Sequence, residues 1–160
     1  MKIIKIETQI QIFESRQALP EASAHLLYEA EKCAKNAYAP YSRFKVGAAI
    51  LLENGTIVVG SNQENAVYPS GLCAERTAAY YASANFPKIP FLKIAITAIN
   101  DTQPLTVPVP PCGSCRQALV EYELLFNKPI EVIMAGETGV VYVVPSVASL
   151  LPCSFNNQFL

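Results

Sequence analysis

The chain has 160 residues, of which 51% are hydrophobic, and its formal net charge is −1. This length suits a single domain with enough apolar side chains to bury a core, so we predict one domain over residues 1–160. A nearly neutral chain offers no basic surface for a polyanion, which excludes nucleic acid as the expected partner and favours a small neutral ligand.

The N-terminal part of the chain is predicted to contain a strand followed by a helix. Lys2–Phe13 alternates isoleucine and polar residues as a strand does, and Glu21–Tyr38 has apolar residues at helical spacing until Pro40 stops it. Residues 1–20 are therefore predicted as an N-terminal strand extension. We expect this extension either to add an edge strand to a sheet or to cover a subunit surface.

The rest of the chain alternates strands and helices. Phe44–Leu52 and Ile57–Val59 are predicted strands, and the Asn54-Gly55 pair between them is typical of a type I′ hairpin turn. The further predicted elements are a helix over Cys73–Ala84, a strand over Phe91–Ile99, a proline-interrupted loop over Pro104–Pro111, a helix from Cys112 through Phe126, strands over Ile130–Met134 and Val140–Val144, and a short helix over Val147–Leu151. Helices that alternate with strands indicate an α/β fold, and the early hairpin indicates a mixed sheet covered by helices.

The N-terminus and the cysteine content bear on the cellular compartment. The first residues alternate isoleucine and polar residues instead of forming the apolar run of a signal peptide, and no stretch is long and apolar enough to span a bilayer. The five cysteines are an odd number, and a reducing compartment would leave all of them as thiols available to a metal. We therefore expect a cytoplasmic protein with no membrane partner.

Two short cysteine motifs carry the strongest chemical signal, Cys73-Ala74-Glu75 and Pro111-Cys112-Gly113-Ser114-Cys115. Zinc takes thiolate ligands, and a catalytic zinc site uses three protein ligands and leaves the fourth position to water. Cys112 and Cys115 have the spacing that chelates one ion from a single turn, and Cys73 is the natural candidate for the third ligand. Glu75 lies close enough to Cys73 to act as a proton shuttle for a bound water.

The predicted helices place these cysteines favourably for metal binding. Cys73 and Cys112 each lie near the start of a helix, where unpaired N–H groups and the helix dipole favour thiolate over thiol. Three thiolates carry more negative charge than a zinc dication neutralises, so a cation is expected nearby.

Other functions of the same cysteines remain open at this point. Cys112 and Cys115 at a helix start also resemble a redox dithiol, and Cys33 or Cys153 could complete a structural zinc site with four thiolates. Glu75 alone could simply be a first-turn glutamate that favours the helix dipole. Tightly bound zinc with an exchangeable water would separate a catalytic site from both alternatives.

The two motifs resemble the Cys-x-Glu and Pro-Cys-x-x-Cys pattern of zinc nucleobase deaminases. Four further segments are similar to the small cytidine deaminases and follow the same order, namely Tyr41–Ala49, Asn62–Ala66, Arg76–Ala78 and Cys115–Gln117. The resemblance covers residues 41–117 and continues weakly into the C-terminal tail. It implies a three-layer α/β/α fold around a mixed sheet of about five strands.

The resemblance also implies the reaction. The chain would be a hydrolase that converts cytidine and deoxycytidine to uridine and deoxyuridine with release of ammonia, as in pyrimidine salvage. Zinc-bound hydroxide would attack C4 of the pyrimidine, while Glu75 passes protons to N3 and to the leaving amino group. Arg76 resembles the arginine that donates hydrogen bonds to ligand sulfurs in three-cysteine members of the family, although it could also be an ordinary surface arginine.

Six substrate-binding residues follow from the resemblance: Phe44, Asn62, Glu64, Tyr68, Ala74 and Phe155. Asn62 and Glu64 resemble residues that bind the ribose hydroxyls, and Phe44 resembles a phenylalanine that packs on the pyrimidine ring. From the residue types alone, Asn62 could instead be a turn residue and Phe44 a core residue.

The small cytidine deaminases also suggest an assembly. By resemblance, we expect a homotetramer that binds one zinc per subunit and a nucleoside substrate, with pockets near subunit interfaces and Phe155 contributed by a neighbouring subunit. A blasticidin-S-type enzyme or another small aminopyrimidine deaminase is the alternative within this chemistry. It shares the cysteine motifs but differs around Glu64.

Overall fold

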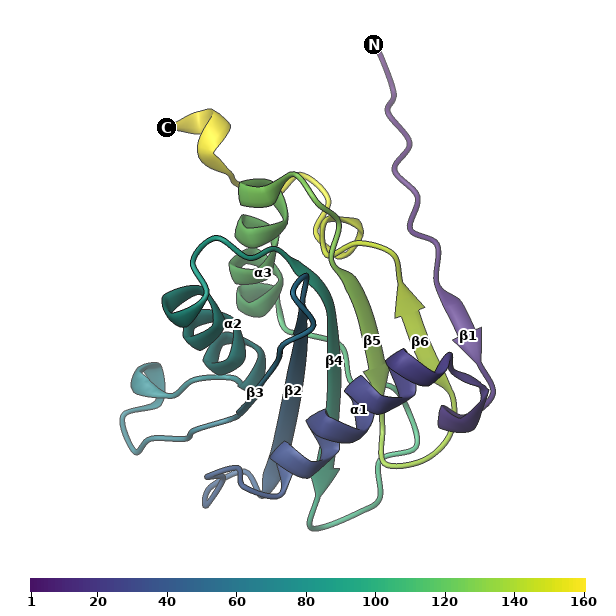
Figure 1. The fold of residues 1–160 in the computed structure, drawn as a ribbon, viewed down its shortest axis with the longest axis vertical. Helices are drawn as coiled ribbons and strands as arrows, with labels where there is room; N and C mark the ends of the chain where they lie inside the picture. The colour runs from purple at the N-terminus through teal and green to yellow at the C-terminus, as the bar shows by residue number, and fades with distance from the viewer.

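A single mixed sheet of six strands runs through the molecule in the order β1-β6-β5-β4-β2-β3 (Figure 1). The computed structural model describes residues 1–160. The strands are β1 Gln11–Phe13, β2 Phe44–Leu52, β3 Ile57–Ser61, β4 Phe91–Asn100, β5 Glu131–Ala135 and β6 Val141–Val144. The α/β prediction is confirmed, with one strand more than the predicted number of about five, because β1 joins the sheet edge beside β6.

The directions of the strands place the segments that precede α2 and α3 at the same end of the sheet. β4 and β5 are parallel, whereas all other neighbouring strands are antiparallel. Because these two strands are covered on both faces, their sequences are nearly continuously apolar. β2 begins at the same end of the sheet at which β3 and β4 finish, since Phe44 pairs with Asn100 and Gly47 with Ser61. The segments that lead into two of the helices therefore leave the sheet at one end.

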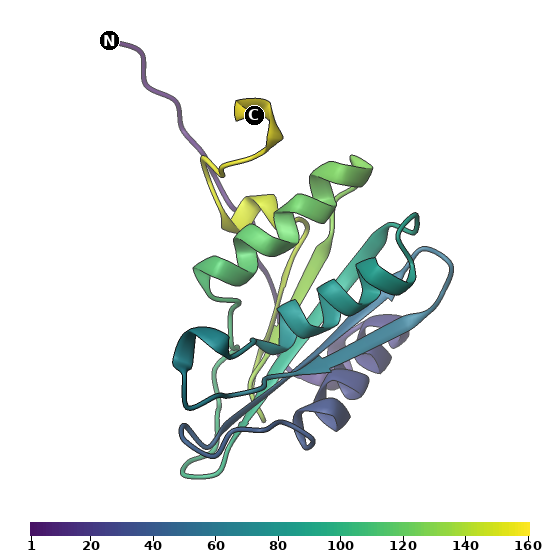
Figure 2. The same ribbon diagram turned by 90° about the vertical axis from the view of Figure 1, so that its left-hand side faces the viewer.

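Three helices cover the two faces of the sheet, as Figure 2 shows. α1 (Glu21–Ala34) packs on one face through Leu26, Leu27 and Ala30, and α2 (Ala74–Asn85) and α3 (Gly113–Phe126) lie on the other. The buried side chains form a separate apolar cluster on each face. The predicted three-layer α/β/α arrangement is confirmed.

The hairpin between β2 and β3 has the predicted strands but a different turn. Gly55 has a φ of 86°, whereas Asn54 is not among the residues with positive φ. A type I′ turn needs positive φ at both central residues, so that prediction is wrong. The Gly55 N–H donates to the Leu52 carbonyl at 2.9 Å, as expected for a longer hairpin loop that ends in a left-handed glycine.

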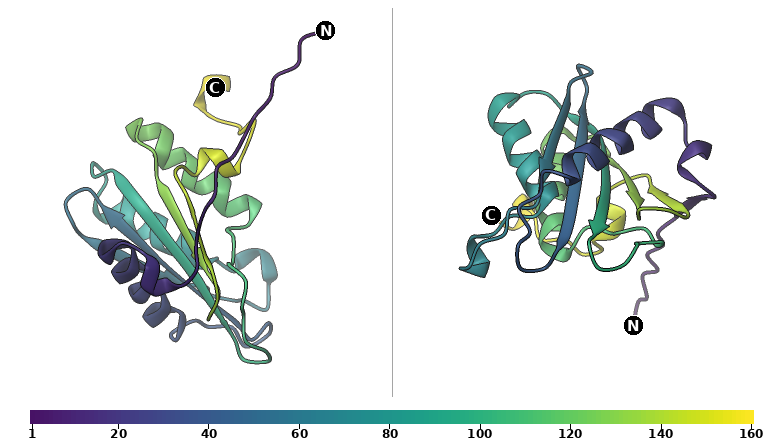
Figure 3. Two further views of the ribbon diagram at one scale, coloured as in Figure 1. Left: turned by 90° about the vertical axis from the view of Figure 1, so that its right-hand side faces the viewer. Right: turned by 90° about the horizontal axis from the view of Figure 1, so that it is seen from below.

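The N-terminal segment is a strand over only part of its predicted length. Gln11–Phe13 pair with Val141–Val143 of β6, whereas residues 1–10 form no helix or strand. β6 ends at Val144 and is followed by Pro145, so beyond the paired residues it offers only Val144, opposite Ile10. Figure 3 shows residues 1–10 running away from the sheet as an extended arm.

Two predicted helices are also shorter than expected. α1 ends at Ala34 because the backbone of Tyr38 pairs elsewhere, accepting from the Glu64 N–H at 2.8 Å and donating to the Asn62 carbonyl at 3.0 Å. The helix predicted over Val147–Leu151 is a single 3-10 turn at Ala148–Leu150. No helix in the structure has the length and apolar character needed to cross a membrane.

Candidate active site

The two cysteine motifs meet at the starts of α2 and α3. Cys73 is the N-cap residue of α2, and Cys112 is the N-cap residue of α3. The sulfur atoms of Cys73, Cys112 and Cys115 all lie within 4.8 Å of one another, and Cys112 and Cys115 are 3.5 Å apart. Cys33 and Cys153 are not part of this group, so the structure gathers three thiols and not four.

The donor set fits a zinc ion. A tetrahedral site with zinc–sulfur bonds of about 2.3 Å has sulfurs about 3.8 Å apart, which is close to the spacing seen here. Hydrogen bonds from Cys115 and Arg76 lower the pKa of the Cys73 thiol to about 5, so this sulfur is readily available as a thiolate. Cys73, Cys112 and Cys115 could therefore hold one zinc and leave a position open to water.

Close packing of α2 on β3 sets the position of Cys73. The buried helix residues Ala74 and Ala78 have small side chains, and Gly60 lies opposite them on the strand. A Cβ on Gly60 would come within 2.5 Å of the Ala78 nitrogen and within 2.7 Å of the Ala74 carbonyl oxygen. A larger residue at position 60 would therefore push away the first turn of α2, which carries Cys73 and Glu75.

Arg116 holds the second motif in place. Its Nε donates to the Pro111 carbonyl at 2.8 Å, and its Nη1 donates to the Leu150 carbonyl at 2.9 Å. The guanidinium thus ties the residue before Cys112 to the 3-10 turn near the C-terminus. Sequence reasoning included Arg116 only as part of a motif and did not identify this positioning role.

Glu75 lies in the first turn of α2 and is nearly buried, with 5% of its surface exposed. Burial is the main cause that raises its pKa above the ordinary value, and the negative charge of the Cys73 thiolate raises it further. A carboxyl group in this setting accepts and holds a proton more readily than one in water. This property suits a group that must take up and release protons in one cycle.

Arg76 provides positive charge beside the sulfurs. Its Nη2 lies 3.5 Å from the Cys73 sulfur, and its Nε is buried without a hydrogen-bond partner. The interaction with Cys73 is the main cause that raises the pKa of the guanidinium. Arg76 therefore remains charged and offsets part of the negative charge of a three-thiolate site.

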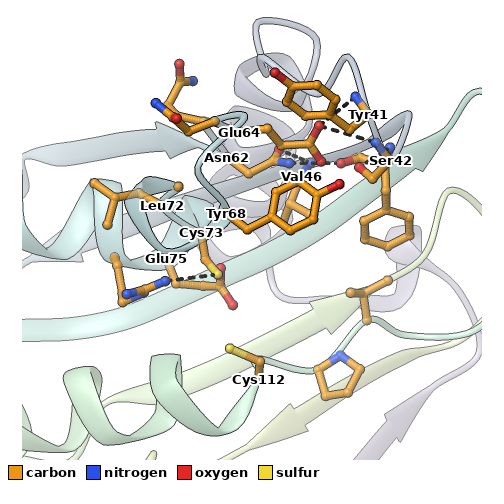
Figure 4. A pocket seen from close by; sticks show the side chains of 17 residues that line it. Tyr41, Ser42, Val46, Asn62, Glu64, Tyr68, Leu72, Cys73, Glu75 and Cys112 are labelled. Atoms are coloured by element: carbon orange, nitrogen blue, oxygen red, sulfur yellow. Dashed lines mark hydrogen bonds between the residues drawn. The ribbon is translucent and has the colours of Figure 1, made fainter.

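A cavity of about 770 Å³ opens at Cys73, Cys112 and Glu75 (Figure 4). The lining residues come from the start of β2, the loop after β3, the start of α2 and the loop before α3. They are Tyr41, Ser42, Phe44, Val46, Asn62, Gln63, Glu64, Asn65, Tyr68, Gly71, Leu72, Cys73, Glu75, Arg76, Val109, Pro110 and Cys112. This volume falls within the range usual for small-molecule sites.

Asn62 and Glu64 make hydrogen bonds to backbone that also lines the cavity. Asn62 Oδ1 accepts from the Val46 N–H at 2.7 Å, and its Nδ2 donates to the Phe44 carbonyl at 2.9 Å. Glu64 Oε2 accepts from the N–H groups of Tyr41 at 2.9 Å and Ser42 at 3.3 Å. A hydrogen bond from the Ser42 side chain is the main cause that holds the pKa of Glu64 below its ordinary value.

Both side chains keep hydrogen-bonding capacity for a ligand. An amide has two N–H bonds and two acceptor lone pairs, and Asn62 uses one of each on the protein. A carboxylate can accept about four hydrogen bonds, so Glu64 also has acceptor sites to spare. Asn62 and Glu64 therefore hold the backbone of residues 41–46 in place while their side chains also line the cavity (Figure 4).

The remaining predicted substrate residues differ in position. Phe44 and Tyr68 line the cavity, and Tyr68 packs edge-on against Tyr41 with the ring centroids 6.2 Å apart. Ala74 is fully buried under the first turn of α2 and is not among the lining residues. Phe155 lies outside this cavity, where it is exposed and stacked on Phe159, while Gln117 donates to its carbonyl at 2.8 Å.

Several lining residues have no counterpart among the predicted site residues. Val46, Leu72, Val109 and Pro110 add apolar surface, and Gln63 and Asn65 add polar groups. Gln63 and Asn65 belong to the segment Asn62–Ala66 and could have been selected from it. Val109 and Pro110 come from a proline-rich loop whose path is fixed only by the tertiary structure.

Comparison with known proteins places this site in a family. The family model for the cytidine and deoxycytidylate deaminase zinc-binding region matches residues 20–126. The chain belongs to this deaminase family. It is 39% identical to the cytidine deaminase of Halalkalibacterium halodurans, over 83% of this chain and 93% of that protein. It is 40% identical to the cytidine deaminase of Sporosarcina psychrophila, over 84% of this chain and 92% of that protein.

Solved structures of cytidine deaminases share the fold of this deaminase. The enzyme from Burkholderia pseudomallei aligns with a TM-score of 0.68 and 36% identity, over 86% of this chain and all (100%) of that chain. The enzyme from Mycobacterium tuberculosis aligns with a TM-score of 0.63 and 29% identity, over 82% of this chain and 94% of the other. The residues matched by the family model contain the three helices, strands β2 to β4 and both cysteine motifs.

Proposed function

We propose that this deaminase is a zinc-dependent cytidine deaminase, which hydrolyses cytidine and deoxycytidine to uridine and deoxyuridine and releases ammonia. The observation that carries the proposal is the gathering of three cysteine sulfurs at a 770 Å³ cavity, which Cys73, Cys112 and the buried Glu75 line. The relatives at 39% and 40% identity are named cytidine deaminases, which supports the choice of substrate.

Cys73, Cys112 and Cys115 are the proposed zinc ligands, with one ion per subunit. When bound, zinc supplies a Lewis acid that makes a water molecule acidic enough to attack at neutral pH. Cys73 and Cys112 line the cavity, so an ion held by the three cysteines would be within reach of a ligand in the cavity. A redox dithiol would require neither Cys73 nor Glu75.

Glu75 is the proposed proton carrier of the reaction. It takes a proton from the attacking water and delivers it to N3 of the pyrimidine, as oxygen bonds to C4. It then takes the proton of the new C4 hydroxyl and delivers it to the amino group, which leaves as ammonia. The sum is water plus cytidine giving uridine plus ammonia. The raised pKa of Glu75 helps it to hold each proton between these transfers.

Arg76 adjusts the charge of the metal site in this proposal. Three thiolates carry a charge of −3 against +2 on zinc, and the guanidinium beside Cys73 adds one positive charge. Without this compensation the ligands would donate more negative charge to the ion, which would make the bound water less acidic.

The rim of the cavity is the proposed nucleoside site. Asn62 and Glu64 have free hydrogen-bonding capacity for sugar hydroxyls, and Phe44 lies at the cavity wall where it can pack on the pyrimidine ring. Tyr68 adds a further aromatic wall, and Ala74 contributes backbone at the start of α2. An enzyme of the blasticidin-S type would have no need for two groups that bind a ribose.

We also propose the oligomeric state and the cellular location that the resemblance to small cytidine deaminases implies. The enzyme would be a cytoplasmic homotetramer of pyrimidine salvage, with each cavity near a subunit interface and Phe155 reaching toward a neighbouring cavity. The exposed position of Phe155 outside its own cavity supports this role. We expect no nucleic acid or membrane partner for a chain with a net charge of −1.

An ultraviolet assay tests the proposed reaction directly. Purified protein loaded with zinc is incubated with cytidine or deoxycytidine, and the absorbance change of conversion to the uracil base is followed together with ammonia release. Turnover should disappear when a chelator removes the zinc and return when zinc is added back. Absence of turnover on both nucleosides by the zinc-loaded protein would refute the proposal.

A further inference from the structure

The arm formed by residues 2–10 carries an apolar face that nothing in the chain covers. Ile4, Ile6 and Ile10 are 77%, 58% and 46% exposed, and Ile12, the next isoleucine on this face, is 58% exposed. All four occupy even positions, so in an extended chain they share one face. The odd positions of this segment carry mostly polar residues, including Lys5 and Glu7.

The backbone of the arm is also unpaired. No main-chain hydrogen bond joins residues 2–9 to the rest of the chain, and the Thr8 hydroxyl donates to the Ser149 carbonyl at 2.6 Å. The arm leads directly into β1, which forms one edge of the six-stranded sheet (Figure 1). An extended apolar segment at an open edge is a template for pairing with another chain.

The charges on the arm are complementary to those of a second copy of the same arm. Lys5 and Glu7 form an ion pair within one arm and lie on its polar face. If two arms pair antiparallel with Ile6 opposite Ile6, Lys5 of each copy faces Glu7 of the other, so both pairs have opposite charges. Centring the pairing on Lys5 or on Glu7 would instead oppose two like charges, which is unfavourable.

We propose that the arm is an interface with a second copy of this chain, in which two arms pair antiparallel around a two-fold axis at Ile6. On one face of the ribbon Ile6 then faces Ile6, Ile4 faces Thr8 and Ile10 faces Lys2 of the other copy. Lys5 and Glu7 of the two copies alternate on the opposite face. The same segment serves both sides of the contact, as an isologous interface requires. A two-stranded ribbon is weak alone, but each arm extends from a complete sheet.

Disulfide trapping tests the register. In the full-length protein, Ile6→Cys places two thiols directly opposite each other, with Cβ atoms about 5 Å apart. Thr8→Cys is the matched control, because the two Thr8 positions would be separated by four residues, or about 14 Å along the ribbon. Under mild oxidation, Ile6→Cys should form a covalent dimer through this residue, while Thr8→Cys should form little. Peptide mapping identifies the linked residues, and unsubstituted protein controls for its exposed Cys112 and Cys153.

Charge reversal tests the pairing between copies. Adding Lys5→Glu to Ile6→Cys should slow cross-linking roughly two- to fivefold, because glutamates then face each other, and further addition of Glu7→Lys should restore the rate. Every second amide within residues 2–9 of the otherwise unaltered protein should exchange with solvent at least about tenfold more slowly than in a free peptide, because alternate N–H groups of an antiparallel pair face the partner strand.

Each other outcome overturns the proposal. Equal or faster trapping at Thr8→Cys would contradict the register, and absence of a linked dimer in both variants would contradict pairing between arms. Protected amides without trapping would mean that the arm binds elsewhere, and unprotected amides would mean that it stays free. None of these measurements depends on catalysis, so the result is independent of the proposed deaminase activity.

Discussion

The floor and the rim of the cavity are held in different ways. The floor is formed by Cys73, Glu75 and Cys112 at the starts of α2 and α3, and Glu75 is 5% exposed. The fully buried Cys115 in the first turn of α3 completes the sulfur group behind this floor, with its sulfur within 4.8 Å of the other two. The rim lies mainly on loops, and its members include Tyr68, which is 77% exposed. The proposed zinc ligands and proton carrier are thus held in place by packed helices. The groups that would contact the sugar are held by hydrogen bonds between loops.

Substitutions in the floor and in the rim should therefore affect different kinetic parameters. A change in the floor removes the metal or the proton carrier and should affect the chemical step itself. A change in the rim alters loop positions and ligand contacts and should affect mainly the apparent affinity for the nucleoside. The variants below test whether the cavity divides in this way.

Loss of a proposed zinc ligand should have the largest effect. Cys115→Ser removes a buried thiol from the three-sulfur group, and two remaining thiols bind zinc far more weakly than three. We expect zinc content, measured by atomic emission, to fall from about one ion per chain to a small fraction of that, with loss of detectable turnover. The matched control Cys153→Ser removes an exposed thiol outside the group and should retain zinc and activity. Full zinc content in Cys115→Ser would contradict the ligand assignment.

Removal of the proton carrier should leave the metal in place. Glu75→Gln keeps the shape of the side chain in its buried position but cannot carry protons, so kcat should fall by roughly 10²–10⁴-fold. Steady-state kinetics and zinc analysis on the same preparation measure both effects. Glu121→Gln, on the surface of α3, is a control for loss of a carboxylate. Retention of ordinary kcat by Glu75→Gln would exclude the proton-carrier role.

Arg76 tests the charge balance of the floor. Arg76→Gln removes the positive charge beside the Cys73 sulfur, and outer partners of metal ligands typically contribute roughly 10- to 100-fold to affinity or activity. We expect a loss of that order in kcat or in zinc retention during competition with a chelator. Arg76→Lys preserves the charge and should recover part of the loss. Equal behaviour of both variants would show that geometry, and not charge, is what Arg76 provides.

Local sequence patterns predicted the floor better than the rim. Cys73 and Cys112 could be assigned to helix starts because each precedes an apolar helical pattern, and their meeting requires only that α2 and α3 begin at one end of the sheet. The bonds from Asn62 to the backbone of Val46 and from Glu64 to that of Tyr41 span 16 and 23 positions. No local pattern specifies bonds between such distant segments.

The sheet edges show the same limit. The alternating pattern of Lys2–Phe13 predicted a strand, but only Gln11–Phe13 pair, and β6 ends one residue beyond this pairing, before Pro145. The alternation of apolar and polar residues indicates that a segment can form a strand, but it does not indicate how long the neighbouring strand is. The hairpin turn was also mispredicted, since Asn54-Gly55 is compatible with more than one loop geometry.

The rim should respond through nucleoside affinity. Glu64→Gln weakens hydrogen bonds to sugar hydroxyls without emptying the position, so kcat/KM for cytidine should fall by about tenfold, mostly through KM. A dideoxy analogue of cytidine lacks the hydroxyls that Glu64 would bind, and its kcat/KM should change much less. A loss of equal size for both substrates would mean that Glu64 acts only by holding the Tyr41 loop.

The carboxylate at the rim should also stabilise the fold in a pH-dependent way. Because the Ser42 side chain and the N–H groups of Tyr41 and Ser42 lower the pKa of Glu64 below 4.5, the folded state favours the ionised form. This contribution is fully present above pH 4.5, the ordinary value, and is lost as pH falls through the lower pKa of the folded state. In denaturant unfolding at several pH values, the stability advantage of the unaltered protein over Glu64→Gln should be constant above that range and shrink below it. An advantage that grew in acid would show that the hydrogen bonds favour the protonated carboxyl, and would remove the electrostatic basis for assigning Glu64 to the rim as a fixed anion.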